Sequence, residues 1–224
     1  SIGNMNRSNS QYISRPVRTA CTAKNRATIT CRPMPKKYGM IHDDNLCIGC
    51  QACSIACRAE NKVADSVYRL QVHIQGPEKL PNGTLKFTYH RQSCVQCENT
   101  PCVSVCPTKA SYKDENGIVS VDVDLCVGCL YCVAACPYQA RYVDPVTKAP
   151  GKCDFCKETR LGRGEEPACV TVCPTDALIF GDLNDPKSAL NKVLSTKVTV
   201  RNKESLGTNP KLFIVPNRRG GIES

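Results

Sequence analysis

Large apolar side chains are scarce in this sequence of 224 residues. It has no tryptophan, four phenylalanines and three methionines, and aromatic residues make up only 5% of the chain. Aromatic packing therefore contributes little to the core. No stretch approaches the roughly 18 to 20 apolar residues that a membrane-spanning helix needs, so the sequence predicts no transmembrane segment of its own.

Catalytic motifs are also lacking. The three histidines, His42, His73 and His90, are scattered along the chain, which favours ordinary surface or core positions over ligand roles. The sequence contains no dinucleotide-binding glycine loop, no P-loop and no nucleophile elbow. We therefore predict a non-catalytic chain without catalytic residues.

Acidic residues are absent from positions 1–40, which hold eight lysines and arginines. Positions 41–224 hold 22 basic and 20 acidic residues, so the net charge of +10 lies mostly near the N-terminus. No nucleic-acid-binding motif accompanies it, and we expect no nucleic-acid partner. Residues 1–36 lack apolar periodicity and are predicted to form a disordered basic tail. Cys21 and Cys31 lie in this tail, outside every ligand run, and we assign them no role.

Cysteine, in contrast, is abundant. Sixteen of the 18 cysteines form four runs, with spacings typical of iron–sulfur ligands. The third run reads C-x2-C-x2-C-x3-C-P, the ligand run of bacterial ferredoxins. Cysteines this close together suit a metal centre better than disulfides between separate chain segments. Four complete runs predict four [4Fe–4S] clusters.

The fourth cysteine of each run is expected to bind the cluster of a partner run. In two-cluster ferredoxins the first three cysteines hold one cluster and the fourth holds the other. Only 19 residues separate runs two and three, so we predict that these two pair, and that runs one and four pair around them. The predicted ligand sets are Cys47, Cys50, Cys53 with Cys173; Cys153, Cys156, Cys169 with Cys57; Cys94, Cys97, Cys102 with Cys136; and Cys126, Cys129, Cys132 with Cys106.

Zinc is the main alternative to iron–sulfur clusters. Four-cysteine zinc sites use two C-x2-C pairs and a long spacer, a pattern that the fourth run alone would fit. Runs one and three each pack four cysteines into eleven residues, which favours iron–sulfur. A zinc-binding interaction module remains the second alternative for the function. The clusters would occupy much of the core, so we predict that the apoprotein does not fold.

The elements predicted around the runs repeat in the order strand, ligand loop, short helix. Prolines at 107, 137 and 174 should end the ligand segments of three runs, whereas Arg58 stands at that place in the first. A helix is predicted over 185–194, with Asp185 as its N-cap. Strands are predicted over 38–43, 85–90, 117–122, 140–144, 177–181 and 210–216.

The predicted fold class is α+β, with two ferredoxin-like 2[4Fe–4S] modules, one inserted in the other. The outer module comprises residues 37–84 plus 140–182 and carries runs one and four. The inserted module comprises 85–139 and carries runs two and three. Residues 183–224 form a C-terminal extension. Cations beside the runs are candidates for raising the cluster potentials: Arg58, Lys109, Lys152 and Lys157.

The runs, their order and the long gap in the fourth resemble the four-cluster iron–sulfur subunits of complex bacterial oxidoreductases. Within that group, several segments resemble the iron–sulfur protein of formate-dependent (cytochrome c) nitrite reductase. These are YGMIHDD (38–44), LCIGC (46–50), DLCVGC (124–129), DPVTK (144–148), KCDFC (152–156) and LGTNPKL (206–212). The resemblance covers residues 37–216.

This resemblance implies electron transfer from a membrane-integral quinol-oxidising subunit toward a multihaem cytochrome c nitrite reductase system. The alternative is the electron-transfer subunit of a molybdopterin oxidoreductase of the polysulfide, tetrathionate or dimethyl sulfoxide type. The family's location implies a periplasmic protein, attached to the membrane through a partner. No export signal is visible, and the cytoplasmic side is the alternative.

Overall fold

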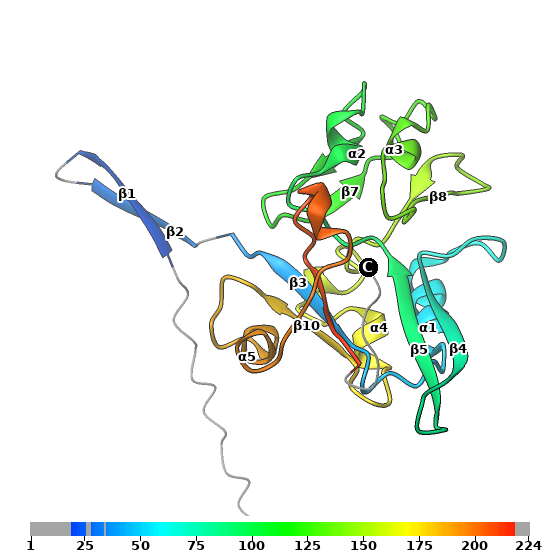
Figure 1. Ribbon diagram of the computed structural model, residues 1–224. Coiled ribbons are helices and arrows are strands. Elements are labelled where there is room, and N and C mark those ends of the chain that lie inside the picture. The colour runs from blue at the N-terminus through cyan, green and yellow to red at the C-terminus, as the bar shows by residue number, and fades with distance from the viewer. Residues whose placement is uncertain (1–18, 26–27, 34, 218–224) are drawn as a thin grey trace, which may run out of the picture. The chain divides into compact units, whose positions relative to one another are not determined.

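The computed structural model describes residues 19–25, 28–33 and 35–217 (Figure 1). The chain divides into two compact units, Ser1–Pro35 and Lys36–Ser224. No helix in the described part of the chain is both long and apolar enough to cross a bilayer.

The first unit contains an antiparallel hairpin of β1 (Thr19–Asn25) and β2 (Thr28–Pro33). The prediction of disorder is therefore wrong for these two segments; the rest of the predicted tail before Pro35 lies outside the described residues. The sequence of the hairpin is rich in β-branched threonine, which favours strands despite its polarity. The register places Cys21 opposite Cys31 along the backbone.

The second unit mixes short helices with short strands, which confirms the predicted mixed helix and strand content. Its helices are α1 (Ala52–Asn61), α2 (Pro101–Ser104), α3 (Tyr131–Ala134), α4 (Ala168–Thr171) and α5 (Ala189–Thr196), with 3-10 turns η1 (Leu161–Arg163) and η2 (Glu204–Leu206). Its strands are β3 (Tyr38–Asp43), β4 (Leu70–Lys79), β5 (Leu85–Ser93), β6 (Ser111–Lys113), β7 (Val119–Val121), β8 (Tyr142–Val143), β9 (Pro150–Gly151), β10 (Leu178–Asp182) and β11 (Leu212–Val215).

A three-stranded sheet supports the first ligand loop. Its order is β10-β3-β11, with β10 antiparallel and β11 parallel to β3. Met40 and Ile41 of β3 are completely buried. The ring of Phe180 stacks on Tyr38 at 5.1 Å between centroids and meets the edge of Phe155 at 5.2 Å. Three of the twelve aromatic residues thus pack together beside the first and fourth runs.

The remaining strands pair as hairpins, β4 with β5, β6 with β7 and β8 with β9. In Figure 1, α2, α3, β7 and β8 gather at one end of the second unit, away from α1 and α4. The six predicted strands are confirmed within a few residues, whereas β4, β6 and β9 were not predicted. The insertion of one module in the other, and the module boundaries, remain predictions.

Helix α5 begins later than predicted. Its N-cap is Ser188, whose Oγ accepts from the Asn191 N–H at 3.2 Å. Asp185 instead accepts from the Lys187 N–H within the preceding turn. The Asn191 side-chain amide donates to the carbonyls of Leu183 and Asp185, and these bonds hold the chain in a turn where the helix was expected to start.

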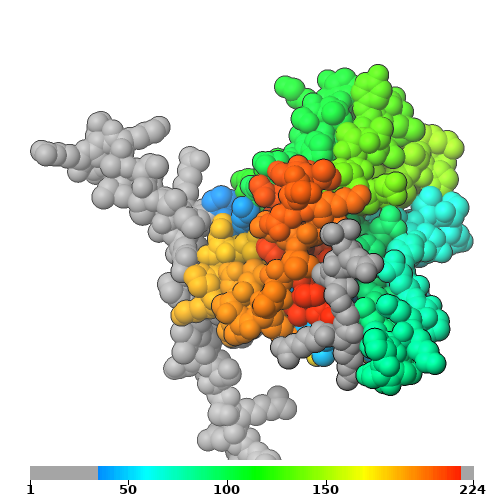
Figure 2. All heavy atoms as spheres, viewed as in Figure 1, coloured from blue at the N-terminus to red at the C-terminus, as the bar shows by residue number. Residues whose placement is uncertain are grey.

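The C-terminal segment lies against the loop of the second run. The Glu98 and Asn99 N–H groups donate to the carbonyls of Asn209 and Thr208, and the Lys211 N–H donates to the carbonyl of Val95. Figure 2 shows this segment in orange, against the green body that contains the second and third runs. Residues after α5 therefore help to shape a ligand loop.

Candidate metal centres

Each cysteine run begins with the same backbone turn. The residue just before the second cysteine has a positive φ in all four runs: Gly49 (68°), Gln96 (52°), Gly128 (67°) and Phe155 (60°). Glycine adopts this conformation without steric cost, whereas Gln96 and Phe155 are held in it by complete burial. The internal repeat in the sequence is thus a repeat of structure.

The third cysteine of every run lies in a short helix. Cys53, Cys102, Cys132 and Cys169 belong to α1, α2, α3 and α4 respectively. Three of these helices have four residues and end before the fourth cysteine and the proline that follows it, so the fourth cysteine lies outside the helix in these runs. Helix α1 has ten residues and includes Cys57, because Arg58 rather than proline follows.

Cysteines from different runs come together in four sets, which we number by their order in space. Site I contains Cys106, Cys126, Cys129 and Cys132. Site II contains Cys94, Cys97, Cys102 and Cys136. Site III contains Cys57, Cys153, Cys156 and Cys169. Site IV contains Cys47, Cys50, Cys53 and Cys173. The groupings have the same members as the four predicted sets, and the assignment of each set to one cluster remains a prediction.

Three of the sites are hollows of similar size. The four cysteines of site I, of site II and of site IV each line one hollow, with empty volumes of about 310, 350 and 370 Å³. Similar hollows with the same four lining groups suit one kind of occupant. At site III the thiols of Cys57 and Cys156 both accept from the Asn61 amide, and Cys153 and Cys169 raise the pKa of Cys57 in addition to burial.

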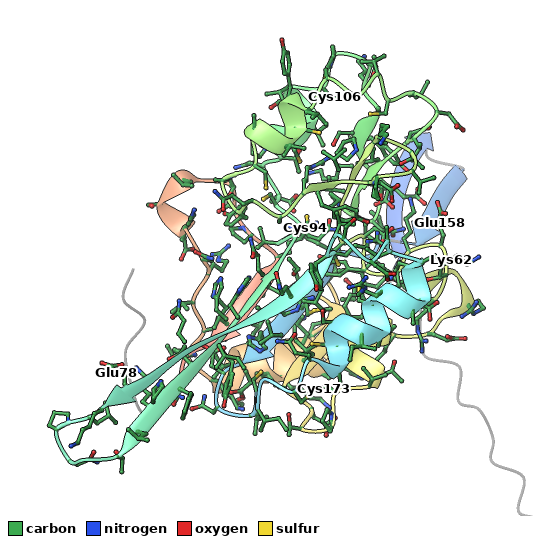
Figure 3. The ribbon with its side chains drawn as sticks, turned by 90° about the vertical axis from the view of Figure 1, so that its right-hand side faces the viewer. Lys62, Glu78, Cys94, Cys106, Glu158 and Cys173 are labelled. Atoms are coloured by element: carbon green, nitrogen blue, oxygen red, sulfur yellow. The ribbon has the colours of Figure 1, made fainter. Side chains whose placement is uncertain are left out.

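The four sites follow one another in a line. The guanidinium of Arg141 interacts electrostatically with the thiol of Cys132 in site I and with the thiol of Cys102 in site II. Gln96, in the loop of site II, donates to the carbonyl of Cys153 in site III at 2.6 Å. The guanidinium of Arg91 interacts electrostatically with the thiol of Cys169 in site III and with the thiol of Cys53 in site IV. Figure 3 agrees: Cys106 lies toward one end of the body, Cys173 toward the other, and Cys94 between them.

Exposure follows this order. Cys129 of site I and Cys50 of site IV are the exposed cysteines among the sixteen. All four cysteines of site III are buried. The line of sites therefore reaches the surface at both ends and is most deeply buried at site III, which is the arrangement that a conductor of electrons needs.

Burial opposes ionisation of several of the free thiols. Burial, with smaller contributions from neighbouring thiols, raises the pKa of Cys97 and of Cys169 to about 12. Burial also raises the pKa of Cys153. Cys106 differs: hydrogen bonds from the Ser111 N–H and Thr108 outweigh burial and lower its pKa. Thiolates at the buried positions thus require positive charge nearby, which iron supplies.

The arrangement also separates a cluster from a single ion. Zinc needs four thiolates that converge to about 2.3 Å from one point. Among the described residues, no group of three or more His, Cys, Asp or Glu side chains could hold one metal ion. Four cysteines around a hollow instead fit a cofactor with several metal atoms, each bonded to one thiolate.

Two family models match the chain, and both describe a 4Fe-4S dicluster domain. One covers residues 46–110 and the other 85–183. The chain is also 83% identical to the B subunit of polysulfide reductase from Wolinella succinogenes. That match runs over 191 residues and covers 85% of this chain and 100% of the relative.

The chain belongs to the family of iron–sulfur electron-transfer subunits that includes NrfC. It is a non-catalytic subunit with four [4Fe–4S] clusters as its cofactors. Protein NrfC of Escherichia coli is 52% identical over 188 residues, 83% of each chain. The thiosulfate reductase electron transfer subunit PhsB of Salmonella typhi is 51% identical over 172 residues, 77% of this chain and 88% of that protein.

Two of the four cations that the sequence suggested for this iron–sulfur subunit are neutralised by carboxylates. Arg58 pairs with Asp65 at 2.9 Å and Lys157 with Asp114 at 2.9 Å. Lys152 is buried and donates to the carbonyl of Cys153 at 2.7 Å, and Lys109 is exposed.

Sequence reasoning missed two other cations, Arg91 and Arg141, which are buried against the thiols. Arg91 precedes Cys94 of site II by three positions but faces sites III and IV, so sequence distance gave no signal for its role.

Proposed function

We propose that the chain relays electrons, one at a time, within a polysulfide-reducing complex. It would accept them from a membrane-integral quinol-oxidising subunit and pass them to a molybdopterin catalytic subunit. The observation that carries this proposal is the 83% identity to the B subunit of polysulfide reductase over the whole length of that protein.

We also propose that each of sites I to IV holds one cluster through its four cysteines. A [4Fe–4S] cluster supplies a centre that takes up and releases one electron without moving atoms. The role of the chain is to hold four such centres in line, to keep water from site III and to bring sites I and IV to the surface. Sites I and II then belong to a module inserted within the module of sites III and IV.

The two ends of the line are the proposed contact points for partner subunits. Beside the exposed Cys129 of site I, Val127 and Tyr131 are 67% and 64% exposed. Beside the exposed Cys50 of site IV, Ile48 is 56% exposed. Large apolar side chains around an outermost ligand are costly in water, and a partner that covers them would also bring its own redox group close.

Purification of the native complex tests the proposed route. A tag on this chain should recover a molybdenum-containing subunit and a membrane subunit, and deletion of the chain should abolish polysulfide reduction with quinol. Recovery of a multihaem cytochrome, with loss of nitrite reduction, would replace this route by the nitrite route, which the 52% identity to NrfC favours as second candidate.

A periplasmic location belongs to the same proposal. It follows from the reductase systems that the chain resembles, in which the membrane partner anchors the iron–sulfur subunit. Protease treatment of spheroplasts tests it: the chain should be digested while the inner membrane is intact. Protection until lysis would assign the cytoplasmic side.

A further inference from the structure

Two arginines are buried at equivalent places in the line of sites. Arg91 is 5% exposed and Arg141 is 7% exposed. Arg91 lies between sites III and IV, and Arg141 lies between sites I and II. Each pair of sites thus has one buried guanidinium at its boundary, although the two arginines come from different places relative to their cysteine runs.

Arg91, in strand β5, lines the hollow of site IV together with Cys53. Its guanidinium lies near the thiol of Cys53 in site IV and the thiols of Cys153 and Cys169 in site III. Its guanidinium makes one hydrogen bond, from Nη1 to the Ser93 Oγ at 2.5 Å. Its Nε and Nη2 atoms are buried without a hydrogen-bond partner among the described residues.

Arg141 repeats this pattern at the other pair. It lines the hollow of site II and acts on Cys102 of that site and on Cys132 of site I. Arg141 lies within hydrogen-bonding reach of the Cys132 thiol of site I and the Cys102 thiol of site II. Its Nη2 donates to the Ser111 Oγ at 2.7 Å, and its Nη1 is buried without a partner in the described part of the chain.

Other cations near the sites are already satisfied by protein oxygens. Arg69 pairs with Asp154 at 3.0 Å and donates to the Lys152 carbonyl. Lys152 donates to the carbonyls of Val119 and Cys153. A buried guanidinium with neither a carboxylate nor a full set of acceptors is strongly unfavourable. Two donor nitrogens of Arg91 and one of Arg141 therefore lack protein acceptors where sulfur ligands converge, and Arg141 already lies within hydrogen-bonding reach of the Cys102 and Cys132 thiols.

We propose that Arg91 and Arg141 each set the reduction potentials of the two clusters beside them, Arg91 at sites III and IV and Arg141 at sites I and II. The inference rests on the four-cluster relay proposed above. The thiolates and sulfides of a bound cluster are the acceptors that the guanidinium N–H groups lack. Accepting one electron adds one negative charge to a cluster and breaks no bond. The neighbouring positive charge stabilises the reduced form and raises its potential.

An EPR-monitored redox titration of the purified holoprotein tests this proposal. The variants are Arg91→Gln and Arg141→Gln, with Arg58→Gln as matched control because it removes a cation beside Cys57 that is already paired with Asp65. One Cys→Ser variant in each site assigns the signals. Iron and sulfide content, measured on every sample, reports on the relay itself and separates its failure from failure of the tuning proposal.

In samples with full cluster content, Arg91→Gln should lower the equilibrium constant for one-electron reduction at sites III and IV about tenfold. This corresponds to a reduction potential lower by about 59 mV. The potentials of sites I and II should not change. Arg141→Gln should do the reverse, and Arg58→Gln should shift none of the four. Unchanged potentials in both variants, or equal shifts at all four sites, would overturn the proposal.

Lysine variants cover the case in which a glutamine variant loses iron. Arg91→Lys and Arg141→Lys keep the charge, and should retain four clusters with potentials closer to those of the unmodified protein than the glutamine variants show. Loss of iron from both the lysine and the glutamine variant of either residue would assign that arginine to cluster assembly, and would refute its tuning role.

Discussion

Cys57 and Cys156 lie beside the same amide: Asn61 Nδ2 donates to the Cys57 thiol at 3.7 Å and to the Cys156 thiol at 3.6 Å. Cys57 belongs to the first run and Cys156 to the fourth. Cys57 therefore crosses from its own run to a partner run, and Asn61 bridges the two. The same crossing places Cys173 beside Cys47, Cys50 and Cys53.

Replacing Asn61 with leucine should lower the potential of the site III cluster. The change keeps the approximate size of the side chain and removes an N–H donor from two sulfur ligands, and such bonds favour the reduced cluster. Redox titration should show a shift at site III, smaller than that of Arg91→Gln, because the amide carries no net charge. An unchanged potential at site III would mean that the bridge has only a structural role.

Removal of iron should unfold the second unit. The hollows of sites I, II and IV are each lined by cysteines from two different runs, and without metal these thiols lose the bonds that join the runs. Treatment with an iron chelator and an oxidant should abolish the circular dichroism signal of secondary structure and make the chain sensitive to protease. Persistence of both properties in an iron-free sample would contradict the coupling of folding to clusters.

Two equivalent glycines allow a matched test of the ligand turns. Alanine at Gly49 or Gly128 must adopt a left-handed backbone, which costs about 1–2 kcal/mol per residue. A Cβ at Gly49 would also lie 2.6 Å from the Tyr89 ring, whereas at Gly128 the nearest atom is 4.0 Å away. Gly49→Ala should therefore lower the unfolding temperature more than Gly128→Ala. An equal effect of both would refute the role of the Tyr89 contact.

Stability should decrease in mild acid through His90. Burial lowers the pKa of this half-buried imidazole below 6.5, so the unfolded chain binds a proton more readily than the folded one. The contribution is complete above the unfolded pKa and is lost as the pH falls through the folded pKa. Denaturant titrations should show this slope below about pH 6.5, and His90→Gln should reduce it. The same slope in the variant would exclude His90 as its source.

Much of the candidate site could be predicted because cysteine spacing dictates local geometry. The short helices with Cys102, Cys132 and Cys169 stop before proline, and the longer α1 follows from Arg58. The family and the cofactor were also predicted correctly. The pairing of runs was predicted from the ferredoxin pattern, in which the fourth cysteine of one run binds the cluster of another, and it remains a prediction.

The remainder depended on contacts between residues that are distant in sequence. Arg91 was missed because it faces sites to which its neighbour Cys94 does not belong. The prediction of Asp185 as the N-cap was wrong because the side-chain amide of Asn191 donates to the Asp185 carbonyl and stabilises a turn before the helix. The N-terminal hairpin was missed because its threonine-rich segments are polar and were interpreted as a disordered tail. Threonine is β-branched, and this favours strands. Of the two routes considered, the sequence favoured nitrite, and identity with known relatives favours polysulfide.

The measurement that tests the account most directly is the cluster content of Cys57→Ser beside that of Cys53→Ser. The two cysteines lie one helical turn apart in α1, yet they belong to different sites. Mössbauer and EPR spectra should show that Cys57→Ser alters the cluster held with Cys153, Cys156 and Cys169, while Cys53→Ser alters the one held with Cys47, Cys50 and Cys173. If both variants damage the same cluster and leave the other three intact, the crossing of runs, and with it the proposed line of four clusters, is contradicted.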